Sequence, residues 1–140
     1  MTDLQKIAVV RRYFTELWNK GNLDVAEEIL APCFGGQGGA MSGPAAARLY
    51  VSSYRSAFPN IHFTLLSLHC QGDLVVACWV GTGAHDASEN CPDAVKPGKE
   101  RTITGLSVYR LENGKIAEMW TGSEATHHAT NSKQSAYSRN

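Results

Sequence analysis

The dipeptide Asn113-Gly114 constrains the fold of this chain more than any other feature, because two alternating apolar runs meet at it. Asparagine and glycine tolerate the positive φ angles that both central positions of a tight two-residue hairpin turn require. The runs on either side, within residues 98–124, are therefore predicted to be paired antiparallel strands. A long twisted hairpin of this kind indicates a β-sheet as the last part of the fold.

Three segments with apolar residues at helical spacing precede the strands. They cover about residues 2–20, 22–31 and 43–58. Thr2 and Gln5 have the spacing of a reciprocal capping pair at the start of the first segment. Glycine or proline follows each segment, which is typical of helix ends. The sequence therefore predicts three helices ahead of the sheet.

The period of the apolar pattern changes from helical to alternating at Ile61. Residues 61–66 alternate as a half-buried strand does, and residues 74–83 are apolar on both parities, which favours a strand covered on two faces. With the closing hairpin this makes four strands after three helices. The order predicts an α+β fold whose sheet curls around a pocket.

Residues 33–43 contain five glycines in eleven positions. A phosphate-binding loop would need a preceding strand, a following helix and a lysine followed by serine or threonine. The predicted element ahead of this segment is a helix and the segment holds no lysine, which disfavours a phosphate loop. Two interpretations stay open, a mobile loop near the mouth of a pocket and a plain surface connection.

Length and charge exclude several classes of protein. We expect one domain over residues 1–128, followed by a polar tail over residues 129–140. Lys plus Arg and Asp plus Glu are both 13, so neither nucleic acid nor a membrane surface is an expected partner. No apolar run reaches the roughly 20 residues needed to span a bilayer. The four cysteines form no C-x-x-C pair, and we expect reduced thiols in a cytoplasmic protein.

Four short motifs lie at the junctions of the predicted elements. They are WNKGNLD at residues 18–24, AFPN at 57–60, GDLV at 72–75 and GKIAEMW at 114–120. Through them the chain resembles, over about residues 5 to 124, the SnoaL-like polyketide cyclases of the nuclear-transport-factor-2-like superfamily. The resemblance implies a cone-shaped, curved antiparallel or mixed sheet packed against three N-terminal helices. It also implies acid–base chemistry without a cofactor, and a homodimer formed through the outer face of the sheet, near Trp79 and Trp120.

Similar sequences commonly carry His-Trp-Asp in the last strand, and an aspartate from this region is the expected acid or base. Here the matching run is Met119-Trp120-Thr121, without the imidazole or that carboxylate. We therefore predict Glu124, the nearest ionisable group, as a catalytic residue. His85 is the second predicted catalytic residue, because it follows Gly83-Ala84 where the family often has Gly-Thr-His. A solvated strand end is the alternative for both side chains.

Strand alternation predicts which side chains meet the ligand. Residues 119 and 121 share one face of the last strand, and Cys78 and Ser107 are expected beside them. Tyr13 and Tyr54 on the helices carry hydroxyls that can donate to a substrate carbonyl. The five histidines match no metal-ligand spacing, so no metal site is predicted. The predicted substrate-binding residues are Tyr13, Tyr54, Cys78, Ser107, Met119 and Thr121.

A pocket of this composition suits a flat, mostly hydrophobic ligand. The first hypothesis is a cofactor-independent cyclase or isomerase that uses acid–base chemistry on a hydrophobic, carbonyl-bearing, polyketide-like small molecule. The second is a module that binds a small molecule without turnover, because the His and Asp positions are changed. An epoxide-hydrolase type of enzyme is a third alternative, which the sequence supports less because no Arg, Asp and Asn cluster is placed for it.

Overall fold

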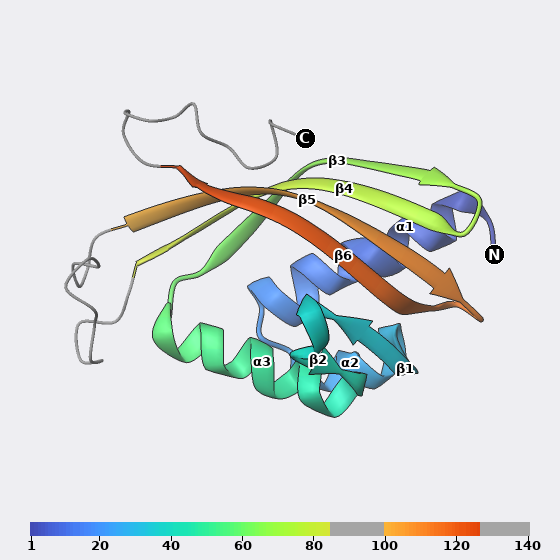
Figure 1. The fold of residues 1–140 in the computed structure, drawn as a ribbon, viewed down its shortest axis with the longest axis horizontal. Coiled ribbons are helices and arrows are strands. Elements are labelled where there is room, and N and C mark those ends of the chain that lie inside the picture. Colours follow the sequence, from blue (N-terminus) through green and yellow to red (C-terminus); the bar gives the residue numbers. More distant parts are fainter. Residues whose placement is uncertain (85–99, 127–140) are drawn as a thin grey trace.

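A curved six-stranded sheet arches over the helices (Figure 1). The computed structural model describes residues 1–84 and 100–126. In chain order the helical elements are α1 (Asp3–Arg12), the π-helical segment η1 (Tyr13–Asn19), the 3₁₀ turn η2 (Leu23–Val25), α2 (Ala26–Ile29), the 3₁₀ turn η3 (Gln37–Gly39) and α3 (Gly43–Ala57). The strands are β1 (Leu30–Gly36), β2 (Met41–Ser42), β3 (His62–Gln71), β4 (Leu74–Ala84), β5 (Glu100–Glu112) and β6 (Lys115–Thr126).

The predicted hairpin is confirmed as β5 and β6. Glu112 pairs with Lys115 across the turn, and Asn113 and Gly114 have φ angles of 54° and 81°. Both central residues thus take the left-handed conformation that the dipeptide favours. The strands continue to the pair Thr102 and Thr126, so the hairpin supplies two long neighbouring strands of the sheet.

The sheet runs in the order β2-β1-β6-β5-β4-β3 and is mixed, because β1 is parallel to β6 while the other neighbours are antiparallel. The α+β fold with a curved mixed sheet is therefore confirmed. The register shifts within the β3–β4 pair and again between Arg110 and Leu111 in the β5–β6 pair. Such irregularities increase local twist and help the sheet bend around one face.

The glycine-rich segment is the main correction to the predicted element order. It was expected to be a loop, but β1 extends to Gly36, η3 follows it, and β2 pairs back through Met41 and Ser42. Two strands therefore lie between the second and third helices. Their signal is weak in the sequence because β1 contains Pro32 and two glycines and sits at the side of the sheet.

The predicted helices are present, with changes in the first two. The Thr2–Gln5 capping pair is confirmed by hydrogen bonds in both directions, but the last turns of the first helix are π-helical. The second helix is short, a 3₁₀ turn followed by four α-helical residues, and Asn22 makes no side-chain cap. The third begins with Pro44 in its first turn and ends before Phe58, as predicted.

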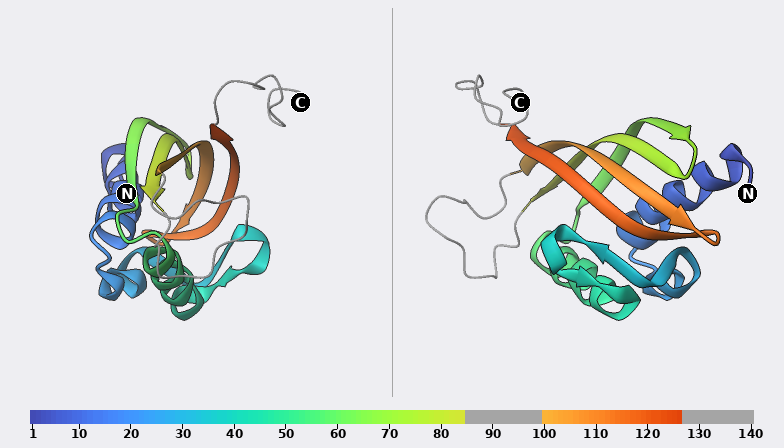
Figure 2. Two further views of the ribbon diagram at one scale, coloured as in Figure 1. Left: turned by 90° about the vertical axis from the view of Figure 1, so that its left-hand side faces the viewer. Right: turned by 45° about the vertical axis from the view of Figure 1, so that its right-hand side comes forward.

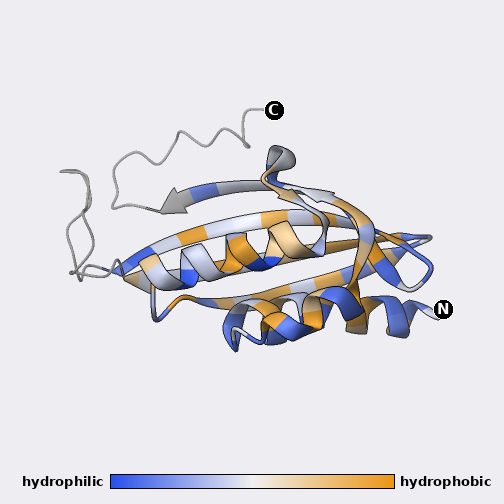
Figure 3. Cartoon of the chain, turned by 90° about the horizontal axis from the view of Figure 1, so that it is seen from below, coloured by the Kyte–Doolittle hydropathy of each residue, from blue (hydrophilic) through white to orange (hydrophobic). Residues whose placement is uncertain are grey.

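The core lies between the helices and the concave face of the sheet, which wraps around them (Figure 2). Val10, Phe14 and Leu17 of the first helical segment and Ala47 and Val51 of α3 are fully or almost fully buried. Apolar and polar residues alternate along these helices (Figure 3), which gives each helix one face for the core and one for water. The packing is incomplete toward one end of the sheet, and a pocket remains there.

Candidate functional site

The pocket lies between the concave face of the sheet and the helical segments η1 and α3, with a volume of about 370 Å³. Side chains at alternate positions of β5 point into it, because residues i and i+2 of a strand share a face. Most lining residues are aromatic or small. They are Tyr13, Phe14, Trp18, Gln37, Tyr50, Tyr54, Phe58, Ile61, Phe63, Trp79, Gly81, Thr82, Gly83, Arg101, Ile103, Ser107, Tyr109, Met119, Thr121 and Ser123.

One end of the pocket, which we call the closed end, is formed by Tyr13, Phe14 and Tyr109. The three side chains are at most 3% exposed. Their ring centroids lie 5.3 to 6.0 Å apart in edge-to-face arrangements. Burial raises the pKa values of the Tyr13 and Tyr109 phenols above the usual 10. Both hydroxyls therefore stay neutral at physiological pH and can donate hydrogen bonds.

The other end, the open end, is formed by Tyr54, Ile103 and Arg101. Tyr54 and Ile103 are 40% and 39% exposed. Gly83 pairs with Arg101 across the β4–β5 ladder. An added Cβ at Gly83 would lie 3.4 Å from the Cβ of Phe58, so the residue that follows α3 packs against β4 at this end.

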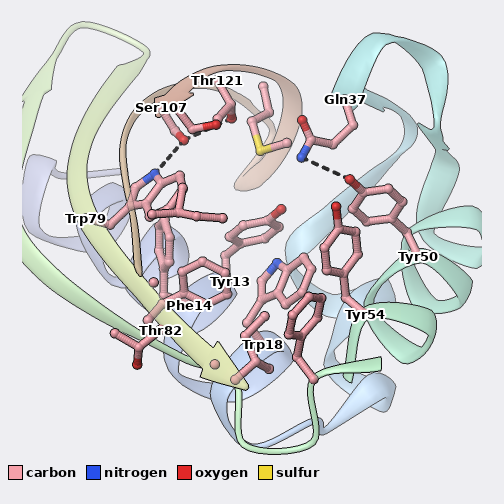
Figure 4. Close-up of a pocket in the computed structure, with 18 of the residues that line it drawn as sticks. Tyr13, Phe14, Trp18, Gln37, Tyr50, Tyr54, Trp79, Thr82, Ser107 and Thr121 are labelled. Carbon is pink, nitrogen blue, oxygen red and sulfur yellow. Dashed lines mark hydrogen bonds between the residues drawn. The ribbon is translucent and has the colours of Figure 1, made fainter. Parts of the chain in front are cut away.

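A hydroxyl pair stands on the sheet side of the pocket. Trp79 Nε1–H donates to Ser107 Oγ at 2.9 Å, and Ser107 Oγ lies 2.9 Å from Thr121 Oγ1 (Figure 4). Gly105 makes this possible, since an added Cβ there would lie 2.1 Å from the Trp79 ring. Because glycine lets the indole lie against β5, the ring nitrogen reaches the serine two residues further along.

A second polar group faces the hydroxyl pair from the helical side (Figure 4). Gln37 Nε2 donates to the Tyr50 hydroxyl at 3.5 Å, a long hydrogen bond. Gln37 has a φ of 51°, a left-handed conformation that is uncommon for a residue with a side chain. Burial, together with a hydrogen bond to Tyr54, raises the pKa of Tyr50 to about 12. This phenol is therefore also a neutral donor.

Aromatic rings connect the two polar groups. Trp18 packs edge-on against Phe63 at 5.2 Å and against Tyr54 at 5.9 Å. Phe63 continues the contact to Trp79 at 5.3 Å. The result is an apolar wall with hydroxyl and amide groups on opposite sides, which fits a flat ring system that carries oxygen atoms at its edges.

Glu124 is not among the residues that line the pocket, and its predicted catalytic role stays a prediction. Glu124 pairs with Thr104, and both alternate with residues that line the pocket, Ser123 on β6 and Ile103 on β5. Its side chain is therefore on the outer face of the sheet. His85 lies outside the described residues, and its predicted catalytic role stays a prediction. Among the described residues that line the pocket there is no carboxylate and no imidazole.

Cys78 is also placed on the outer face, while Trp79 lines the pocket. The residue that pairs with Ser107 on β4 is Ala77, so position 79, and not 78, shares the face of Ser107. Trp79 is thus not on the outer face, where it was expected, but Trp120 is exposed there at 51%. Only the register of β4 against β5 shows that Trp79, and not Cys78, faces the pocket.

Five predicted substrate-binding residues do line the pocket, namely Tyr13, Tyr54, Ser107, Met119 and Thr121. Their role in binding a substrate stays a prediction. Gln37, Trp79 and Arg101 line the pocket without having been predicted. For Arg101 a signal existed, because it has the same parity on the strand as Ser107. Gln37 was missed because residues 33–43 were assigned to a loop, for which no strand pattern predicts the direction of a side chain.

Within residues 1–84 and 100–126, no three His, Cys, Asp or Glu side chains come together as metal ligands would. In the same part of the chain, no helix has both the length and the apolar character required to cross a membrane.

The chain belongs to the SnoaL-like polyketide cyclase family, whose profile matches residues 8–125. Among similar solved structures is IdmH, a proposed polyketide cyclase from Streptomyces antibioticus, with 25% identity, a TM-score of 0.72, and coverage of 86% of this chain and 92% of IdmH. A proposed polyketide cyclase from Acidithiobacillus ferrooxidans has 24% identity and a TM-score of 0.72, with 86% and 88% coverage. TsrD from Streptomyces laurentii has 18% identity and a TM-score of 0.76, with 89% and 91% coverage. No curated protein matches the sequence.

Proposed function

We propose that this protein is a cofactor-independent cyclase or isomerase that acts on a flat, hydrophobic, carbonyl-bearing molecule of the polyketide type. Membership in the SnoaL-like family supports a reaction of the cyclase or isomerase type. The observation that carries the proposal is the aromatic pocket with neutral hydroxyl donors on opposite sides, at Ser107 and Thr121 and at Tyr50.

The proposed reaction begins when a base removes a proton from the carbon next to a substrate carbonyl, which leaves an enolate. Neutral hydroxyls hold the developing negative charge on the enolate oxygen. In a cyclisation the enolate carbon forms a bond to a second carbonyl carbon, and the resulting alkoxide takes the proton back from the acid form of the base. In an isomerisation the proton returns to a different carbon.

The pocket divides these roles between two sources. Ser107, Thr121 and the buried Tyr13 would supply the hydrogen bonds, because each lines the pocket as a neutral hydroxyl. The base would be His85, which directly follows β4, the strand that contributes Trp79 and Gly83 to the pocket wall. An imidazole is suited to the task because its usual pKa lies near physiological pH.

A binding module without turnover is the second candidate. It is favoured by the lack of any carboxylate or imidazole among the described residues that line the pocket. The epoxide-hydrolase alternative has less support, since Arg101 lines the pocket without an aspartate or asparagine from the described residues beside it.

Deuterium exchange into 2-tetralone tests the proposal without knowledge of the natural substrate, because this flat bicyclic ketone has acidic α-protons. We expect the protein to accelerate the exchange in D₂O, followed by NMR, above the buffer rate. His85→Ala should lower the acceleration by about 100-fold or more, as loss of a general base does. Ser107→Ala should lower it by about tenfold or more, because an enolate donor is lost.

Thr104→Val is the matched control for these variants, since Thr104 is exposed on the outer face of β5 and should leave the rate unchanged. If 2-tetralone binds but exchanges at the buffer rate, the protein is a binding module. If His85→Ala exchanges as fast as the natural protein, His85 is not the base.

We further propose that the protein forms a homodimer through the outer face of the sheet. Apolar side chains gather there, and Trp120 is half exposed. Val76, Val108 and Trp120 occupy one row across three strands. Light scattering after size-exclusion chromatography should give the mass of a dimer, and Trp120→Glu should shift it to the mass of a monomer.

A further inference from the structure

Arg101 is the single charged side chain among the described residues that line the pocket. It lies on the inner face of β5, in the same row of alternate positions as Ile103, Gly105 and Ser107. Its partner across the β4–β5 ladder is Gly83, which packs against Ile61 and Phe58. Arg101 therefore lies at the open end of the pocket, on the strand next to this packed wall.

No ion pair within the described part of the chain satisfies this guanidinium. Other arginines with partly buried side chains are satisfied, Arg12 by Glu16 and Glu28 and Arg110 by Glu112 and Glu118. Arg101 is half-buried beside an apolar wall, where a charge without a counter-charge is unfavourable. The charge of the pocket lining is thus positive, with one group suited to bidentate binding of a planar anion.

The distance along β5 between Arg101 and Ser107 sets the length of a ligand that would contact both side chains. Ser107 is six positions after Arg101, a Cα separation of roughly 20 Å at the usual rise of a strand. The arginine side chain shortens the gap that a ligand must fill. Between them lie Ile103 and Gly105, with the Trp79 ring against the glycine. Two or three fused rings match this apolar stretch.

From these observations we propose that Arg101 binds a carboxylate of the ligand, so that the substrate class is an aromatic or polyketide-like acid, not the corresponding neutral ester or amide. In this arrangement the guanidinium holds the carboxylate at the open end. The ring system lies along the aromatic wall, and its carbonyl group reaches the Ser107 and Thr121 hydroxyls. The inference rests on the proposed binding of a flat ring system in this pocket.

Calorimetric binding of 2-naphthoate and of naphthalene-2-carboxamide tests the assignment, because the two probes share size and shape and differ in charge. The natural protein should bind 2-naphthoate about tenfold or more tightly than the amide, as a charge-assisted hydrogen bond gives. Arg101→Gln should remove this preference through weaker binding of 2-naphthoate alone. Arg101→Lys should retain part of it, since the charge stays but the bidentate geometry is lost.

Arg11→Gln is the matched control, because Arg11 is exposed on α1, away from the pocket, and its loss changes the net charge equally. It should keep the full preference for 2-naphthoate. Equal affinities for the two probes in the natural protein, or a preference that survives in Arg101→Gln, would overturn the carboxylate site and leave the pocket function standing. Failure of both probes to bind the natural protein would overturn the site and the proposed binding function together.

Discussion

The closed and open ends of the pocket are built on the same strand, yet they differ in almost every physical property. At the closed end Tyr109 of β5 is buried against Tyr13 and Phe14, and its ring contacts are edge-to-face on both. At the open end the same strand presents Arg101 and a partly exposed Ile103. The change takes place over the five alternate positions of β5 from Arg101 to Tyr109.

This difference implies that the closed end mainly stabilises the fold and that the open end mainly determines which ligand binds. Buried aromatic side chains contribute most to the free energy of folding, because their removal leaves large cavities. Exposed pocket residues contribute less, since water already reaches them. The closed end is therefore the part that holds the helices to the sheet. The open end is free to carry groups that favour one ligand over another.

The largest expected effect is at the closed end. Phe14 contacts the rings of Tyr13, Tyr109, Phe63 and Trp79, at centroid distances of 5.4 to 6.4 Å. Phe14→Ala should lower the free energy of unfolding by about 3–5 kcal/mol, as measured by urea denaturation. Tyr54→Ala at the open end should cost less than about 2 kcal/mol. An equal decrease in the free energy of unfolding for Phe14→Ala and Tyr54→Ala would contradict the proposed difference in stability between the two ends.

The junction between the ends, Gly105, should show an intermediate effect. A Cβ at this position overlaps the Trp79 ring, so Gly105→Ala should cost about 1–3 kcal/mol and change the near-ultraviolet circular dichroism of the tryptophan. Gly122→Ala is the control, because nothing lies within 4 Å of its added Cβ. The control should stay within about 0.5 kcal/mol of the natural protein. A neutral Gly105→Ala variant with an unchanged spectrum would contradict the packing of Trp79 on β5.

The smallest effect is expected in alkaline solution. Burial raises the pKa values of Tyr13 and Tyr109, while phenols in an unfolded chain ionise near 10. Above pH 10 the unfolded chain therefore binds fewer protons than the folded protein, and the free energy of unfolding falls as pH rises. Each buried phenol contributes a slope of up to about 1.4 kcal/mol per pH unit.

Tyr109→Phe should reduce this slope, because it removes one of the two phenols, whereas Tyr54→Phe serves as the comparison at the open end. Urea denaturation between pH 8 and pH 11 measures the slope for each variant. The same slope in Tyr109→Phe and in the natural protein would show that Tyr109 ionises in the folded state as it does in the unfolded chain.

Local chemistry explains why much of the fold was predictable. The Asn113-Gly114 turn, the Thr2–Gln5 cap and the proline and glycine stops of α3 each depend on residues close together in the sequence. β1 depends on a partner far along the chain, since Leu30 pairs with Ile116, and the two-residue strand β2 depends on β1. β1 has too little alternation and β2 is too short to be predicted as strands from the local sequence alone.

The candidate site was predictable to the extent that strand parity could be followed. Within β6, parity placed Met119 and Thr121 together on the pocket wall. Between strands it failed for Cys78, because the register of β4 against β5 depends on pairings that no local pattern reveals. Glu124 was chosen for its chemistry, and the same parity rule that worked for Thr121 places it on the outer face.

The parallel pairing of β1 with β6 has a consequence for the synthesis of the protein. Residues 30–36 leave the ribosome long before residues 115–126, and β2, α3 and three strands are made in between. Until β6 arrives, β1 lacks its only long neighbour in the described sheet. Contacts of such large sequence separation slow folding. In the nascent chain β1 therefore lacks this neighbour, and the sheet around the pocket is complete only after β6 has left the ribosome.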